Sequence, residues 1–132
     1  MTIAVLRGSG SAEGQNGSAV VEFVLVLPVL FLILLALVEI AVVARTQLDL
    51  IHASRVAARE AAATPEVARA VEAAVASLGR TLSENARISV RRPSVVGRRA
   101  EVEITLPYRA FSPLLGGISV ELKARSVMRV ER

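Results

Sequence analysis

The sequence predicts an α+β fold with a long N-terminal helix that passes from a membrane into water, a short second helix and a small antiparallel three-stranded sheet. Three observations predict this fold. A long apolar run lies near the N-terminus, the stretch after it is rich in helix formers and lacks glycine and proline, and three later segments alternate apolar and polar residues. With 132 residues, the chain has room for one small domain beside the membrane segment.

The composition narrows the class of protein. Hydrophobic residues make up 53% of the chain but aromatic residues only 3%, so few rings are present to stack on bases. The net charge of +4 comes from arginines interspersed with glutamates, a pattern typical of a solvated, salt-bridged surface. Nucleic acid is therefore not the expected partner, although membrane headgroups remain possible.

No enzymatic site stands out in the sequence. The chain has no cysteine, which excludes disulfides and thiolate zinc sites, and the single histidine, His52, lacks a second histidine for a metal site. No P-loop, dinucleotide fingerprint or G-x-S-x-G elbow occurs. We therefore expect a non-enzymatic protein with no catalytic residue, no cofactor and no metal.

Residues 18–44 are predicted to form the transmembrane half of the first helix. Glu22 and Glu39 are the only ionisable residues between positions 19 and 44, and residues 23–38 contain none. A helix of this length extends about 39 Å, enough to cross a hydrocarbon core of roughly 30 Å. A cleaved secretory signal is the alternative, with Val42 and Ala44 at its cleavage site, but the apolar run is longer than is usual for one.

The helix is expected to continue into water as its soluble half, residues 45–63. Arg45 and Asp49 are four residues apart and of opposite charge, a spacing that stabilises helices. Pro65 disfavours helical geometry at the preceding residue, so the helix should end there. Residues 1–17, which are rich in small polar residues, are interpreted as a disordered leader peptide.

A short second helix should follow. Thr64 is the expected N-cap, Pro65 the first helical residue and Gly79 the end of the helix. One apolar stripe at spacings of four, four and three should face the core. Its members are Val67, Val71, Val75 and Leu78.

Three strands are predicted after this helix. Apolar residues alternate with polar ones around residues 88–90, 100–106 and 118–130, and turn residues separate the three segments. An antiparallel meander is the simplest topology, with one face wet. Glu101 and Glu103 fall on that wet face, which favours a solvated surface over paired acid/base chemistry.

The carboxylate of Glu22 lies where the apolar run begins. A charged side chain in hydrocarbon costs on the order of 2.5–3.5 kcal/mol on insertion scales, so it needs a partner or a shallow position. The simplest interpretation is that Glu22, three residues after Ala19, reaches the headgroups and has no special function. Glu39, near the other end of the run, is interpreted as an exposed interfacial acid.

The local order of residues supports a more specific interpretation of Glu22. Residues 17–23 read "GSAVVEF", which resembles the processing site of the type IV prepilin superfamily, in its tight-adherence (Flp or Tad) branch. The wider chain resembles the TadE-like family of minor pilins, or pseudopilins. The resemblance rests on three segments, which together comprise 52 of the 132 residues: "GSAVVEFVLVLPVLFLILLALVEI", "ARTQLDLIHASRVAAREAA" and "ARSVMRVER".

This resemblance implies a set of roles. A prepilin peptidase would cut between Gly17 and Ser18, and Glu22 with Phe23 would serve recognition and assembly. An α-amino group ordinarily titrates at about pH 7.7–8.0, so the new terminus would be largely protonated and could pair with Glu22 of its own chain or of a neighbour. The implied partners are other pilins, the prepilin peptidase and the assembly platform of the inner membrane.

The resemblance also implies a pilin-like location. The span would lie in the cytoplasmic membrane, residues 64–132 would form a small extracytoplasmic α+β domain, and the protein could enter an extracellular pilus. The leader departs from the family's habit, because only Arg7 precedes Gly17, while Arg45 and further arginines follow the span and favour the opposite orientation. The alternative is an uncleaved, single-pass envelope protein that acts as a binding or scaffold module.

Overall fold

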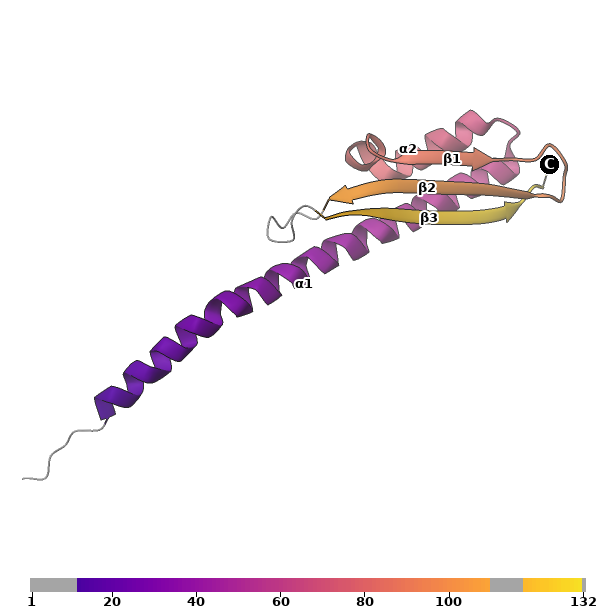
Figure 1. The fold of residues 1–132 in the computed structure, drawn as a ribbon. Helices are drawn as coiled ribbons and strands as arrows, with labels where there is room; N and C mark the ends of the chain where they lie inside the picture. The colour runs from indigo at the N-terminus through magenta and orange to yellow at the C-terminus, as the bar shows by residue number, and fades with distance from the viewer. Residues whose placement is uncertain (1–11, 110–117, 132) are drawn as a thin grey trace, which may run out of the picture. The chain divides into compact units, whose positions relative to one another are not determined.

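The computed structural model describes residues 12–109 and 118–131 (Figure 1). The α+β prediction is confirmed: a long apolar helix is followed by a short helix and a three-stranded antiparallel sheet. The elements in chain order are α1 (Ala12–Ala63), α2 (Val67–Ser83), β1 (Arg87–Arg91), β2 (Arg99–Arg109) and β3 (Ser119–Arg129).

The contacts divide the chain into two compact units, Met1–Leu37 and Val38–Arg132. The first unit contributes the N-terminal part of α1. The second contains the rest of α1, the second helix, the sheet and the whole buried core. The compact unit that holds the core therefore includes helical residues from Val38 onward.

Helix α1 begins earlier than the sequence suggests. It starts at Ala12 rather than near Ser18, so residues 12–17 of the expected leader are helical, while residues 1–11 lie outside the described residues. Extending an existing helix by a turn is favourable once it is nucleated, and alanine, glutamate and glutamine in this stretch are good helix formers. The predicted end is confirmed, since α1 stops at Ala63.

The predicted cap of α2 is wrong. The hydroxyl of Thr64 donates to Oε1 of Glu60 at 2.9 Å, and its backbone N–H donates to the Glu60 carbonyl at 2.9 Å, so Thr64 completes α1 instead. Helix α2 starts at Val67, with Glu66 at the N-cap position and no side-chain cap. Gly79 leaves helical geometry with φ +74°, as expected, but the chain then resumes a helical turn as far as Ser83.

The buried stripe of α2 also differs from the predicted one. Ala70, Ala74 and Leu78 are buried, whereas Val67 and Val75 are 42% and 40% exposed. Both sets follow helical spacing, so periodicity alone cannot choose between them. The alanine face is the one buried because small side chains let the helix approach the core closely.

The three strands form the predicted meander in the order β1-β2-β3. Ile88 pairs with Ile104, which pairs in turn with Ala124, and both ladders are antiparallel. Apolar residues of one face are buried, while the charged residues between them stay exposed or half-buried. Both helices contribute to the core on that face (Figure 1).

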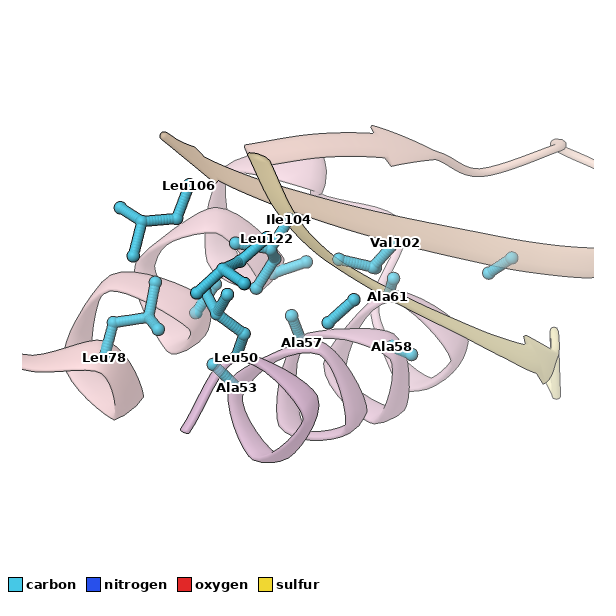
Figure 2. Close-up of a cluster of buried hydrophobic side chains, with 14 of the residues drawn as sticks. Leu50, Ala53, Ala57, Ala58, Ala61, Leu78, Val102, Ile104, Leu106 and Leu122 are labelled. Atoms are coloured by element: carbon cyan, nitrogen blue, oxygen red, sulfur yellow. The ribbon is translucent and has the colours of Figure 1, made fainter. Parts of the chain in front are cut away.

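The core joins small side chains of α1 to larger ones of the sheet. Figure 2 shows a row of alanines and one leucine on α1 facing branched side chains of β2 and β3, with Leu78 of α2 beside them. The α1 residues in this row are Leu50, Ala53, Ala57, Ala58 and Ala61, and all are fully buried. Because these side chains are small, the helix axis can lie close to the strands.

We predict that Ala57→Leu destabilises the domain by about 1–3 kcal/mol, because added methylene groups in a packed core force side chains and backbone to shift. Ala57 is 0% exposed. The same substitution at Ala76, an exposed residue of α2, is the matched control. Thermal unfolding of the full chain in detergent, followed by circular dichroism, should show a lower midpoint for Ala57→Leu alone; equal midpoints would contradict the packing described.

Candidate functional site

The residues singled out by the sequence all lie on the first part of α1. Gly17, Ser18, Glu22 and Phe23 are helical and exposed, and Phe23 is 62% exposed. Ser18 and Glu22 are four residues apart, so they share one face of the helix with a rise of about 6 Å between them. Their roles in processing and assembly stay predictions.

Gly17 is not required by the packing of the described chain. Its backbone is helical, without positive φ, and a Cβ built on it meets no described heavy atom within 4 Å. A glycine inside a helix costs about 1 kcal/mol relative to alanine. Among the described residues, no contact accounts for a glycine at this position.

The apolar part of α1 is exposed along its length. Apart from the half-buried Leu35, the large apolar side chains from Val20 to Val42 are 46% to 70% exposed. Within the described residues, one helix is long and apolar enough to cross a membrane; it lies in Gly17–Ala63, and none of its 18-residue apolar window is buried. In water such a surface would be unfavourable, so it fits a segment covered by lipid or by other apolar helices.

A second polar site lies where α1 meets the sheet. The hydroxyl of Tyr108 on β2 donates to Oε1 of Glu39 on α1 at 2.9 Å. A few residues further along α1, Nε2 of Gln47 donates to the carbonyl of Lys123 on β3 at 2.8 Å. These two bonds hold the end of β2 and the middle of β3 beside the helix.

The two acids on the wet face of the sheet, Glu101 and Glu103, lie beside an arginine. Glu101 binds Arg125 through both carboxylate oxygens, at 2.7 Å to Nε and 2.8 Å to Nη2. Glu103 lies opposite Arg125 in the strand register, and His52 is exposed on α1. In the part of the chain that the structure describes, no group of three or more histidines and acids could hold a metal ion.

Comparison with known proteins adds one finding to this geometry. Residues 17–59 match the family model of TadE-like proteins. The resemblance seen in the sequence is thereby confirmed over this stretch, which we call the TadE-like segment. No curated protein and no solved structure matches the chain.

The TadE-like segment begins at Gly17 and ends at Arg59, so it comprises the exposed apolar part of α1 and most of its soluble part. The strands lie outside it. Together with the exposed apolar helix, the match fits a pilus-associated, single-pass membrane protein.

Sequence reasoning missed the bond between Glu39 of the TadE-like segment and Tyr108. The sequence predicts an exposed interfacial acid at Glu39, yet this side chain is half-buried and accepts a hydrogen bond from the chain's single tyrosine. The strand alternation carried a usable signal, because Tyr108 follows Leu106 on the face that packs against α1. A polar side chain on that face needs a polar partner, and Glu39 is the acid nearest the end of the apolar run.

The environment of Tyr108 raises the pKa of its hydroxyl above the usual value of 10.0, first through desolvation and then through the hydrogen bond and negative charge of Glu39. A raised pKa means that the folded state favours the neutral tyrosine. This contribution to stability is fully present below about pH 10 and is lost as the pH rises through the raised pKa.

We predict that Glu39→Gln lowers the pKa of Tyr108 toward 10.0, because the negative charge beside the hydroxyl disappears while desolvation remains. The chain has one tyrosine and no tryptophan, so absorbance of tyrosinate during an alkaline titration reports this residue alone. Glu84→Gln, at an exposed position after α2, is the control and should leave the titration unchanged. An unchanged curve for Glu39→Gln would contradict the bond.

Proposed function

We propose that the protein is a minor pilin, or pseudopilin, of a tight-adherence pilus, processed between Gly17 and Ser18 by a prepilin peptidase. It would have no enzymatic activity of its own. The observation that carries this proposal is the coincidence of two findings: the family match starts at Gly17, and none of the 18-residue apolar window in the helix that follows is buried.

The open space around Gly17, where a Cβ would meet no described heavy atom within 4 Å, supports the processing step. Because no described neighbour requires a glycine there, a requirement from a second protein explains it better than packing does. A peptidase that accepts only a small residue before the cut would be such a requirement. The cut would leave Ser18 at the start of the exposed apolar helix.

The position of Glu22 supports a role in assembly. After the cut, the ammonium of Ser18 and the carboxylate of Glu22 would lie about one helical turn apart. In a low-dielectric environment either charge alone is costly, whereas the pair offsets part of that cost. The amine of a neighbouring, axially staggered pilin could serve as the partner equally well, so the pair would set the register between subunits.

The exposed apolar surface supplies the packing. Residues 20–42 would contact lipid while the protein is in the cytoplasmic membrane, and other pilins once it has been incorporated. Residues 64–132 would then lie outside the cytoplasm. The expected partners are other pilins, the prepilin peptidase and the assembly platform.

An uncleaved, membrane-anchored binding module is the second candidate. The continuity of α1 favours it, because the helix runs without a break from Ala12 through the bond between Gly17 and Ser18. The poorly basic leader, with Arg7 alone before Gly17, points the same way. In this case the small domain would recruit an envelope partner and the leader would remain.

We predict that the mature protein, purified from membranes of cells with an active prepilin peptidase, starts at Ser18. Mass spectrometry of the intact chain measures this directly. Gly17→Leu should abolish the cut while leaving the fold intact, since the site is open. The same substitution at Gly14, also in α1, should leave cleavage unchanged. A chain that still carries Met1 in the unsubstituted protein would favour the anchored module.

We further predict that Glu22→Ala inserts into the membrane but does not enter filaments, because the substitution removes the acid and leaves the apolar span longer. Filaments sheared from cells and blotted for the subunit provide the measurement. Glu72→Ala, at an exposed position of α2, should enter filaments normally. Normal incorporation of Glu22→Ala would contradict the assembly role.

A further inference from the structure

One end of the sheet carries apolar side chains that the core does not cover. Ile118 and Val120 at the start of β3 are 56% and 48% exposed. Val120 pairs with Tyr108 across the ladder, one step beyond the buried pair of Leu106 and Leu122. We call Tyr108, Ile118 and Val120 the apolar sheet end.

The apolar sheet end is tied to a defined level of α1. Tyr108 donates to Glu39 at 2.9 Å, and Gln47 donates to the carbonyl of Lys123 at 2.8 Å. All of these groups belong to the same compact unit, Val38–Arg132. The start of β3 is therefore held beside the turns of α1 that begin at Glu39.

Those turns are where the continuous exposed apolar surface of α1 ends, and beyond them the exposed large apolar side chains of α1 are the separate Leu48 and Val56. Ile40 and Val42 are 64% and 46% exposed, whereas Thr46 and Leu50 are already buried against the domain. Glu22 and Glu39 are separated by about 26 Å of helix, close to a hydrocarbon thickness of roughly 30 Å. With Glu22 near one boundary of the bilayer, Glu39 falls near the other.

We propose that the apolar sheet end lies in the headgroup region of the bilayer and contacts lipid, so that the domain touches the membrane at a second place besides α1. This proposal rests on the membrane insertion of α1, and it holds whether or not the leader is cut. Its support is continuity: the exposed side chains of β3 extend the apolar surface of α1 at the level where the span ends.

The chemistry of the surroundings fits a lipid surface. Tyrosine is enriched at membrane–water interfaces, where its ring is partly buried and its hydroxyl finds a polar partner. Arg87 and Arg109 are exposed at this end of the sheet, Arg109 pairing with Ser119 in the ladder. Basic side chains next to a bilayer are attracted to anionic headgroups.

The chain has no cysteine, so single-cysteine probes can test the contact in the full-length, uncut protein. Ile118→Cys and Val120→Cys would each carry a polarity-sensitive fluorophore in phosphatidylcholine vesicles with and without phosphatidylglycerol. Val96→Cys, at a 61% exposed position in the turn before β2, is the matched control at the opposite end of the sheet. Lipids bearing a nitroxide at the headgroup serve as quenchers.

We expect the probes at positions 118 and 120 to show a blue-shifted emission and strong quenching, and the probe at position 96 to show neither. Phosphatidylglycerol should increase the quenching. Tyr108→Phe, which removes the bond to Glu39 and keeps the ring, should reduce quenching at position 118.

Equal quenching at positions 96, 118 and 120 would overturn the proposal. Shielding of position 118 from water without quenching by lipid would indicate a protein partner instead, and would also overturn it. A probe at Leu30, in the exposed apolar part of α1, reports insertion separately. If that probe also escapes a quencher deep in the bilayer, the membrane span itself is refuted, which separates the two failures.

Discussion

The fold depends on one constraint on α1. The N-terminal part of this helix must keep a continuous apolar surface out of water, while its C-terminal part contributes side chains to the core of the domain. Between Val20 and Val42 all but one of the large apolar side chains of α1 are exposed, the exception being the half-buried Leu35. From Leu50 onward, alanines turn inward and the sheet covers them. The surroundings of α1 therefore differ along its length. Its large apolar side chains lie in the exposed part, and its small alanines lie in the part that packs against the sheet.

Small side chains determine how the domain packs. Ala53, Ala57 and Ala61 recur along α1, and Ala70 and Ala74 along α2, all of them fully buried. Such residues bury little area each, but they let helices lie close to Val102 and Ile104 of the central strand. This close approach lets a domain with few aromatic residues fill its core. Such a core tolerates little added volume.

Most of the architecture could be predicted from the sequence because it follows from periodicity and composition. The apolar run predicted the exposed helix, and alternation predicted the three strands and their meander. The misses have local physical causes. Thr64 serves α1 rather than capping α2 because Glu60 is within reach of its hydroxyl, and the stripe of α2 shifted because alanine is ambiguous in an apolar pattern.

One part of the candidate site could be predicted from the sequence and another part could not. A motif of adjacent residues, from Gly17 to Phe23, could be recognised in the sequence, and the family match begins there. The bond between Glu39 and Tyr108 could not be, because it joins residues far apart in the chain and depends on how far along α1 the sheet lies. The apolar and polar periodicity of a sequence predicts the face of the helix or strand on which a residue lies. It does not predict which distant residue that side chain contacts.

Two hydrogen bonds join α1 to β3 and to the residues just after it. β3 is an edge strand of the sheet, and α1 meets it through Gln47 at the Lys123 carbonyl, near the middle of the strand, and through the Ala62 carbonyl, which accepts from the N–H of Glu131 two residues beyond its end. An unprotected edge strand invites pairing with strands of other molecules. Because Gln47 already occupies the Lys123 carbonyl near the middle of β3, a foreign strand cannot pair with that edge along its whole length.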